Sequence, residues 1–257
     1  MWMPSISGLI ERRILLNYRV DADVLARLLP PPFEPLLVDG AGVAGVCLIR
    51  LRDVRPAALP AWLGLRSENV AHRIAVTWDD NGIERQGVYV PRRDTNSWLT
   101  VLAGGRLFPG VHHQAHIAVE EAAGHYHIRV NSLDTETAIS VDATIASRFH
   151  SLIFSTLADA SRFFVAGSCG YSPQRTPRRY EGLELDCNRW QMTPLAVSEV
   201  HSSFFEDRVK FPSGSVEFDS GLLMRNIPHQ WRKLESIRGD GTITSKTLLP
   251  AGEGGQR

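Results

Sequence analysis

The stretch Gly104-Gly105-Arg106-Leu107-Phe108-Pro109-Gly110-Val111-His112-His113-Gln114-Ala115-His116 joins a glycine-rich turn to a segment that carries three histidines. Paired glycines end helices, so we expect a helix to stop here and a strand to follow. Alternation along that strand places His113 and Ala115 on the inward face. The same alternation places His112 and His116 on the outward, polar face.

The histidines of this segment and of the returning strand suggest a metal site, but the alternation argues against one. His125 and His127 share the polar face with Glu120 and Arg129. The polar face of an antiparallel hairpin normally contacts water. We therefore expect solvated histidines and no bound metal. An inward histidine is more often a hydrogen-bonded core residue than a catalyst, so both interpretations of His113 stay open.

Composition limits the classes of partner. The chain has 257 residues, of which 28 are basic and 28 acidic, so its formal net charge is zero. It therefore lacks the single-sign field that attracts nucleic acid or an anionic membrane, and no apolar run reaches the length of a membrane span. We expect one domain over residues 1–250, a disordered tail over residues 251–257, and no signal peptide.

Residues with nucleophilic side chains are few. Cys47, Cys169 and Cys187 are odd in number and lack metal-ligand spacing, which favours free thiols in a cytoplasmic protein. Only three of the 28 basic residues are lysines, so few amines are available to form a Schiff base.

Hydrophobic periodicity predicts an α+β fold, mainly antiparallel β, with two or three helices. The expected helices are residues 22–29, a segment capped by Asp94 or Thr95 that ends at Gly104-Gly105, and residues 152–165. The expected strands are residues 13–20, 43–51, 69–78, 87–90, 111–120, 125–130, 137–146, 181–185, 197–205, 215–218 and 222–225. The run Asp79-Asp80-Asn81-Gly82 predicts a tight turn between two of these strands.

Two further groups are candidates for a binding or catalytic role. Arg92-Arg93-Asp94 is either a solvated loop or an anion site, because arginine is a bidentate donor to carboxylates. Glu68 precedes an apolar strand and is either a surface residue or a pocket residue. The chain has no Gly-x-Ser-x-Gly elbow, and a strand rather than a helix follows its glycine-rich turn. Neither a serine hydrolase nor a dinucleotide-binding fingerprint is therefore present.

Several motifs, in their order along the chain, resemble the acetoacetate decarboxylase-like superfamily, and an uncharacterised branch of it most of all. The first motif runs from Asn17 to Glu34, and the second is the Gly105-Arg106 turn with the strand up to Ala115. The further motifs are Ser67-Glu68-Asn69, Arg92 to Thr95, Gly170 to Pro173, Phe218 to Ser220, and Arg225 to His229. The resemblance covers roughly residues 10–235.

This resemblance implies a cone-shaped β-barrel with surrounding strands and a pocket inside the barrel. In the decarboxylase, a pocket lysine attacks the substrate ketone, a familiar case of amine catalysis. Counting from Gly105-Arg106 without gaps puts His113 at the lysine's position, and imidazole cannot form a stable imine with a ketone. The family's pocket glutamate corresponds to Glu68 with a one-residue gap, and its N-terminal pocket arginine falls near residues 11–13.

Two functions follow as expectations. In the first, the protein binds a small organic acid or ketone, and His113 and Glu68 are the catalytic acid and base, without a Schiff base. An anionic group of the ligand is then held by Arg106, Arg92 or Arg93. In the second, the same fold is a non-catalytic binding or structural module in which His113 only fills the barrel. Neither needs a cofactor, and both leave enzyme activity and homo-oligomer formation open.

Overall fold

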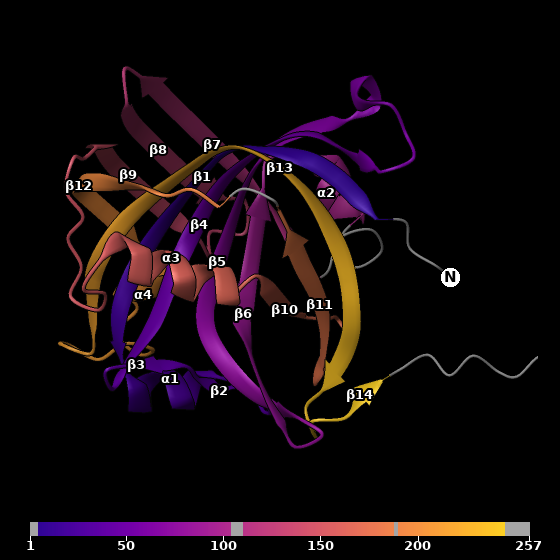
Figure 1. Ribbon diagram of the computed structural model, residues 1–257, viewed down its shortest axis with the longest axis vertical. Helices are drawn as coiled ribbons and strands as arrows, with labels where there is room; N and C mark the ends of the chain where they lie inside the picture. The colour runs from indigo at the N-terminus through magenta and orange to yellow at the C-terminus, as the bar shows by residue number, and fades with distance from the viewer. Residues whose placement is uncertain (1–4, 104–109, 188–189, 245–257) are drawn as a thin grey trace, which may run out of the picture.

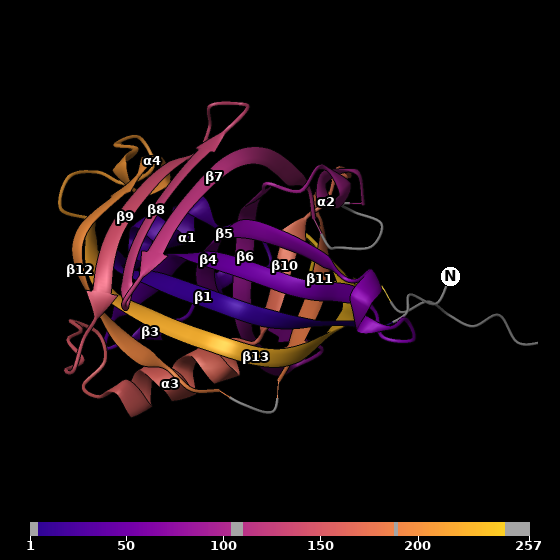
Figure 2. The same ribbon diagram turned by 90° about the horizontal axis from the view of Figure 1, so that it is seen from above.

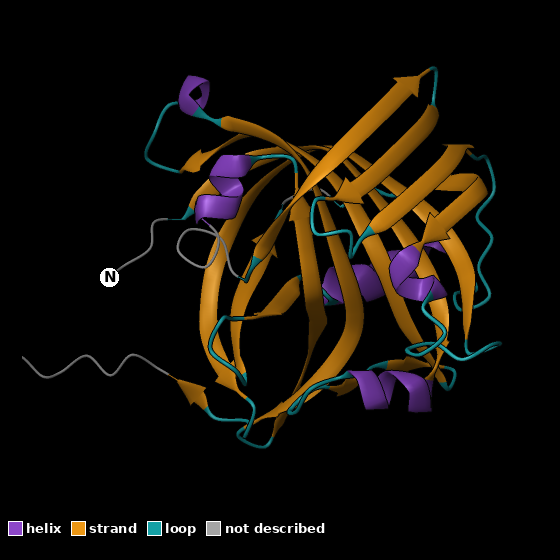
Figure 3. Ribbon diagram, turned by 180° about the vertical axis from the view of Figure 1, so that it is seen from behind, coloured by secondary structure: helices purple, strands orange, loops and turns teal. Residues whose placement is uncertain are grey.

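The computed structural model describes residues 5–103, 110–187 and 190–244, and their strands pair into two closed rings (Figures 1 and 3). The fold is α+β and dominated by antiparallel strands, as predicted. The first ring has seven strands: β1 (Ile6–Asp21), β4 (Ala41–Pro56), β5 (Leu65–Asp80), β6 (Ile83–Thr95), β10 (Cys169–Pro173), β11 (Arg179–Asp186) and β13 (Val216–Arg238).

The second ring shares five strands with the first and closes through four others. The shared strands are β13, β1, β4, β5 and β6. The closing strands are β7 (His112–Ala122), β8 (His125–Ser132), β9 (Ala138–Ile145) and β12 (Thr193–Ser202). The short strands β2 (Glu34–Pro35), β3 (Leu37–Val38) and β14 (Ile243–Thr244) extend the edges. The helices are α1 (Ala22–Leu28), η1 (Ala61–Leu63), α2 (Trp98–Ala103), α3 (Leu157–Ala166) and α4 (Ser203–Glu206).

The shared strands are buried on both faces, because each face belongs to the interior of a different ring. All residues of β4 from Ala41 to Leu48 are buried, and so are all residues of β5 from Val70 to Ile74. Successive side chains of a strand point to opposite faces, so only a strand covered on both sides can bury an unbroken run. This arrangement explains the continuous apolar run of β4, where a surface strand would alternate.

Two hydrophobic cores result, one on each side of β1, β4 and β13. Ile14 and Leu16 belong to the core that β7, β8 and β9 cover, whereas Leu15, between them, belongs to the core that α3 covers. Figure 2 shows the same division, with β7, β8 and β9 on one side of the shared strands and α3 on the other. The sequence predicts the strands correctly but not that their second faces are also buried.

The local signals for turns and caps mostly hold. Asn81 and Gly82 have φ angles of 56° and 83°, which the asparagine–glycine pair adopts readily in the predicted turn between β5 and β6. The Asp21 carboxylate accepts a hydrogen bond from Asp23 N at 3.0 Å and caps α1. The cap of α2 differs from the prediction, because β6 runs through Asp94 and Thr95 and Ser97 Oγ accepts from Thr100 N instead.

Four predicted elements have different bounds for physical reasons. The expected helix over residues 152–165 begins only at Leu157, because Thr156 is its cap and the preceding segment bonds to β13. The expected strand over residues 197–205 ends at Ser202, where α4 begins. The two strands expected over residues 215–225 are one strand, β13, since its turn-like residues Asp219 and Ser220 sit in a register shift opposite Asn17 and Tyr18.

Candidate functional site

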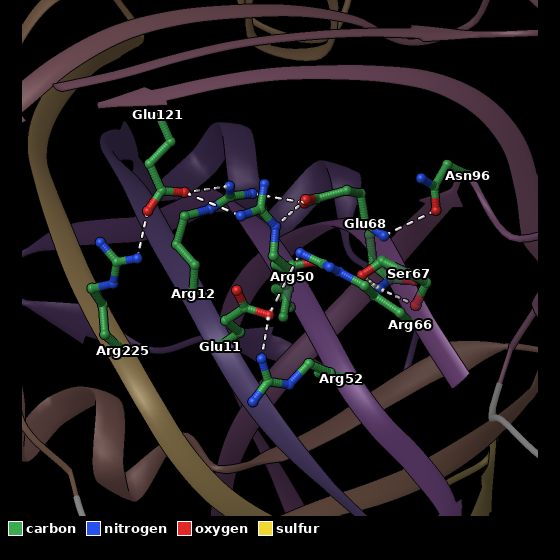
Figure 4. A network of polar contacts seen from close by, with 12 residues as sticks. Glu11, Arg12, Arg50, Arg52, Arg66, Ser67, Glu68, Asn96, Glu121 and Arg225 are labelled. Carbon is green, nitrogen blue, oxygen red and sulfur yellow. Dashed lines mark hydrogen bonds and ion pairs between the residues drawn. The ribbon is translucent and has the colours of Figure 1, made fainter. Parts of the chain in front are cut away.

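Glu68 lies in an ion-pair network inside the nine-strand ring (Figure 4). Its carboxylate accepts from Arg12 Nη2 at 2.7 Å and from Arg50 Nε at 2.5 Å. Both arginines also contact Glu121 Oε2, each at 3.3 Å. Arg225, on β13, donates to the second oxygen of Glu121 at 2.5 Å. Among the described residues, every carboxylate of this network is therefore bound by at least two guanidinium groups.

In this network the two carboxylates, Glu68 and Glu121, are held by three arginines of the protein itself, which supports a structural role. The Arg12 side chain is 1% exposed and that of Glu68 is 13% exposed. A buried charge is tolerated when it is paired and hydrogen-bonded, and both conditions hold here. Of the two arginines that the sequence places near the family's pocket position, Arg12 is thus the one that contacts Glu68.

His113 belongs to a second polar group, at the junction of β6 and β7. Its Nδ1 lies 2.9 Å from Asp134 Oδ2, and its side chain is 36% exposed. Arg92 Nη2 joins Asp134 Oδ1 and Asp94 Oδ1, each at 2.7 Å. Burial raises the pKa of Asp94, although Arg92 acts in the opposite direction. Arg92 is therefore committed to two carboxylates of the protein itself.

The two predicted catalytic residues share a sheet face but not a contact. Residues opposite each other on neighbouring strands point to the same face, and Val70, Asp94 and His113 are opposite one another on β5, β6 and β7. Glu68 is two residues from Val70 on β5, so it points to the same face as His113. Among the described contacts, however, His113 bonds to Asp134 and Glu68 bonds to Arg12 and Arg50. The expected His–Glu pair is not formed. Arg106 lies outside the described residues.

The seven-strand ring encloses two adjoining cavities. The larger one has a volume of about 110 Å³, and each of the ring's seven strands contributes to its lining together with Gly167 and Ser168 at the end of α3. The other has a volume of about 70 Å³ and reaches α2 and the start of β7. The two cavities share the lining residues Ile49, Ala71, Arg93, Leu183 and Trp231. Neither His113 nor Glu68 is among the described residues that line them.

Three arginines line the larger cavity: Arg13 on β1, Arg73 on β5 and Arg93 on β6. Arg93 lines the second cavity too. None of the three has a carboxylate partner among the described ion pairs. Their partners are neutral: Arg13 Nη2 donates to Cys47 Sγ at 3.6 Å, Arg93 Nε donates to Ser172 Oγ at 3.0 Å, and Arg73 Nη2 donates to Asn17 Oδ1.

Several guanidinium groups of this cluster still have hydrogen-bonding capacity. Nε and Nη1 of both Arg13 and Arg73 are buried without a partner among the described residues. The Arg73 side chain belongs to a residue that is 3% exposed, and its guanidinium carbon lies 4.7 Å from the centre of the Phe164 ring. Burial lowers the pKa of Arg73, and burial lowers the pKa of Arg93 to about 10. A buried guanidinium with unused donors favours an anionic ligand.

The sulfur of Cys47 lies among these arginines. Burial would raise the pKa of its thiol, but the charges of Arg13 and Arg73 outweigh burial, so the pKa is lowered overall. Gly45, two residues earlier on β4, leaves space for Arg73, because a Cβ there would lie 3.1 Å from Arg73 Nη2. The cavity wall therefore combines cationic donors with a thiol.

His112 corrects the sequence prediction, since it lines the second cavity instead of facing outward. Burial is the largest cause that lowers its pKa, to about 3, and the charge of Arg93 acts in the same direction. The alternation itself is right: His112 points away from the face of His113. The outer side of β7 faces the interior of the seven-strand ring at this point, because β7 begins beside Arg93 of β6.

Among the described residues, Arg93 is the predicted binding residue that lines the cavities. Sequence reasoning missed Arg73 and Cys47, and it gave Arg13 only as one of three residues near the family's pocket arginine. A signal for Arg73 exists in hindsight, because small Ala71 and Ala75 flank it on the second face of β5. Small residues around one long polar side chain leave room for a cavity. That face looks solvent-exposed when a single sheet is assumed.

The search for other site types yields two findings about the described residues. They contain no group of three or more His, Cys, Asp or Glu residues able to hold a metal ion. The histidines at positions 125 and 127 instead contact Asp142, at 3.0 and 3.3 Å. None of the helices in this part of the chain has the length and apolar character needed to cross a bilayer.

Solved structures with the same fold include three enzymes or enzyme-like proteins. An acetoacetate decarboxylase from Legionella pneumophila has a TM-score of 0.61 at 12% identity, covering 96% of this chain and 90% of that one. The enduracididine biosynthesis enzyme MppR, complexed with pyruvate, has a TM-score of 0.57 at 13% identity, covering 91% of each chain. An acetoacetate decarboxylase-like enzyme from Sphingomonas wittichii RW1 has a TM-score of 0.55 at 16% identity, covering 92% and 95%.

These similarities confirm the predicted acetoacetate decarboxylase-like fold. At such low identity they concern the fold alone. No curated protein matches the chain in sequence. A family model, described as an uncharacterized conserved protein, matches residues 10–217, which is most of the chain. The chain therefore belongs to the DUF2071 family, on an acetoacetate decarboxylase-like fold.

Proposed function

We propose that this protein binds a small organic acid inside the seven-strand ring, with Arg13, Arg73 and Arg93 as ligands of its carboxylate. The observation that carries the proposal is the set of unused donors on Arg73, a 3% exposed residue on the cavity wall. A buried charge without a counterion is costly, and a bound carboxylate supplies the missing one. Two parallel N–H groups of a guanidinium match the two oxygens of a carboxylate.

The size and lining of the cavities support a small ligand. Volumes of about 110 and 70 Å³ are several times the roughly 10–15 Å³ that one water needs. The second cavity is lined mainly by apolar side chains, which suit the hydrocarbon part of an organic acid. One structural neighbour, MppR, is described with pyruvate bound. Pyruvate is therefore the first acid to test here.

Acid/base chemistry is the finer part of the proposal, and its candidate residues point into the nine-strand ring, away from the two cavities. His113 is the candidate acid or base for a keto acid that enters that ring, and its contact with Asp134 at 2.9 Å supports this role by fixing the imidazole. Glu68, on the same face, is the second candidate, and it contacts Arg12 and Arg50. The competing function is non-catalytic binding of the same acid, in which His113 has only a structural role.

Replacing Arg73 with methionine tests the binding site. Arg73→Met removes the charge but keeps an unbranched chain, so we expect pyruvate affinity to fall roughly 10- to 150-fold, the equivalent of 1.5–3 kcal/mol for a hydrogen bond to a charged group. Isothermal titration calorimetry with pyruvate and with its neutral amide measures the effect. Arg129→Met, at an exposed position on β8, is the matched control and should bind pyruvate like the wild type.

A turnover assay, combined with the same titration, separates catalysis from binding without catalysis. His113→Ala, assayed for turnover of pyruvate and other 2- and 3-keto acids, should bind the acid but lose turnover. Binding without turnover in the wild type would favour the non-catalytic function. Equal binding of pyruvate and its amide, or unchanged affinity in Arg73→Met, would contradict the proposed site.

A further inference from the structure

Cys47 occupies a particular place in the arginine-lined cavity. It is 2% exposed to solvent, yet its side chain lines the cavity of about 110 Å³. Arg13 reaches it from β1, with Nη2 3.6 Å from the sulfur, and Arg73 reaches it from β5. The register explains this arrangement, because Cys47 of β4 is opposite Leu15 on one side and Ala71 on the other, each two residues from one of the arginines.

The other two cysteines are in different surroundings. Cys169 lies near Glu184, and burial together with that carboxylate raises the pKa of its thiol. Neither Cys169 nor Cys187 lines either interior cavity. Thiolates are the nucleophilic form of cysteine, and neighbouring cations favour them. Cys47 is therefore the cysteine whose position combines a ligand cavity with stabilising cations.

We propose that the Cys47 thiol adds reversibly to the carbonyl carbon of a 2-keto acid bound in this cavity and forms a thiohemiketal. The inference rests on the proposed binding of an organic acid by Arg13 and Arg73. It goes further by naming the nucleophile and the substrate class. Cysteine thus supplies the covalent attachment for which the described part of the chain offers no lysine on the cavity wall.

The substrate class follows from the position of the sulfur relative to the guanidinium groups. A carboxylate held by the unused donors of Arg13 and Arg73 lies beside the sulfur, since Arg13 Nη2, on the same guanidinium, is 3.6 Å from Cys47 Sγ. The carbon closest to the sulfur is then the one bonded to the carboxylate. That carbon is electrophilic in a 2-keto acid, whereas in a 3-keto acid the carbonyl is one carbon further away.

The addition balances without any other reactant. A carbon–sulfur bond forms, the π bond of the carbonyl breaks, and the proton of the thiol ends on the former carbonyl oxygen. Nothing is oxidised or reduced, and no group leaves. Arg93 lines the same cavity, and the several N–H groups of its guanidinium let it bind the carboxylate and also donate a hydrogen bond to this oxygen while its charge develops.

Carbon-13 NMR of the whole protein with [2-¹³C]pyruvate tests the inference. In the wild type we expect loss of the bound ketone signal and a new signal from a tetrahedral carbon that bears sulfur. Cys47→Ser keeps an acceptor for Arg13, so it should bind pyruvate in calorimetry but show only the ketone and the hydrate of free pyruvate. Cys169→Ser is the matched control and should give the wild-type spectrum.

The outcomes distinguish this inference from the proposed function. Pyruvate that binds with its ketone signal intact overturns the role of Cys47 and leaves carboxylate binding standing. Absence of pyruvate binding to the wild type overturns both. A tetrahedral signal that persists in Cys47→Ser also refutes the inference.

Alkylation provides a second measurement that does not depend on a folded Cys47 variant. Iodoacetate carries a carboxylate and iodoacetamide does not, so the arginines should make Cys47 react faster with iodoacetate. Peptide mass spectrometry compares the rates at Cys47 and at Cys169, which lies near a carboxylate and should prefer the neutral reagent. An unreactive Cys47, or one that prefers iodoacetamide, contradicts a cation-supported nucleophile.

Discussion

Arg12 and Arg13 point to opposite faces of β1, and each enters the interior of a different ring. Arg12 contacts two carboxylates, those of Glu68 and Glu121. Arg13 contacts the thiol of Cys47, and its Nε and Nη1 have no hydrogen-bond partner among the described residues. Nε of Arg12 has no partner among them either, but of the two side chains it is Arg13 that lines the cavity. The carboxylate partners of Arg12 support a structural role, and the position of Arg13 supports the proposed ligand-binding role.

At the residue scale, Glu68→Gln should destabilise the protein. Arg12 is 1% exposed and would lose its shortest ion pair, while Arg50 would lose its 2.5 Å partner. Removing one member of a buried pair costs roughly 3–5 kcal/mol, and we expect about 3 kcal/mol because Glu121 still contacts both arginines. Urea unfolding followed by circular dichroism measures the loss.

The control for this prediction is a carboxylate in an exposed ion pair. Glu199 contacts His201, and both side chains are about 60% exposed. Glu199→Gln should change the free energy of unfolding by less than about 0.5 kcal/mol. If Glu68→Gln were equally harmless, the network of Figure 4 would not be a source of stability.

At the element scale, the start of α3 depends on a carboxylate from another strand. Asp219 of β13 accepts hydrogen bonds from Leu152 N at 2.5 Å, Ile153 N at 3.1 Å and Ser151 Oγ at 2.8 Å. These bonds hold the segment before α3 in a non-helical conformation, so the helix begins at its own cap, Thr156. The Phe218-Asp219-Ser220 motif noted in the sequence thus anchors the segment that positions α3.

Asp219→Ala should therefore loosen this segment selectively. Each hydrogen bond to a charged group contributes roughly 1.5–3 kcal/mol, and buried N–H groups would lose their acceptor. We expect much faster amide hydrogen exchange at residues 152 and 153, with little change in the β7–β8 hairpin, which Asp219 does not contact. Equal exchange in both regions would indicate global destabilisation and contradict a local anchoring role.

At the scale of the whole molecule, the two closed rings bury histidines away from water. Burial, with smaller effects of Arg92 and Lys210, lowers the pKa of His72 to about 3. Its two ring nitrogens have no hydrogen-bond partner among the described residues. Burial also lowers the pKa of His229, to about 4. These imidazoles remain neutral in the folded protein at pH values where the unfolded chain would protonate them.

The sign of the pH dependence follows from these pKa values. The ordinary histidine pKa is 6.5, so below it the unfolded chain takes up protons that folded His72 does not take up until about pH 3. The contribution of His72 to the free energy of unfolding is therefore fully present above pH 6.5, and it is lost as the pH drops toward 3. Each such histidine contributes a slope of about 1.4 kcal/mol per pH unit in the middle of this window.

Urea unfolding at several pH values between 3 and 7 checks this expectation. His72→Leu should reduce the slope of the unfolding free energy against pH by about 1.4 kcal/mol per pH unit, the effect of one proton, because the variant has no imidazole to protonate on unfolding. His201→Asn, at an exposed position, should leave the slope nearly unchanged. A slope unaffected by His72→Leu would mean that His72 is protonated in the folded state too.

Much of the fold is predictable from local patterns, and the site is not. The strands of the shared sheet, the turn at Asn81-Gly82 and the cap of α1 follow from alternation, glycine placement and a capping carboxylate. The outward prediction for His112 is wrong, because alternation tells which side a residue faces but not what covers that side. The alternation places His113 and Glu68 on one face but does not tell which side chains contact each of them, and these are Asp134 and Arg12.

The sequence by itself determined the mainly antiparallel α+β class, the resemblance to its superfamily and the absence of a lysine where that lineage forms its imine. Those properties depend on the identity of each residue and of its neighbours along the chain. Only the tertiary structure decided that Arg13, Arg73, Arg93 and Cys47 meet at one cavity. They come from four different strands, and their meeting depends on strand register and ring closure, which bring residues far apart in the chain within a few ångströms.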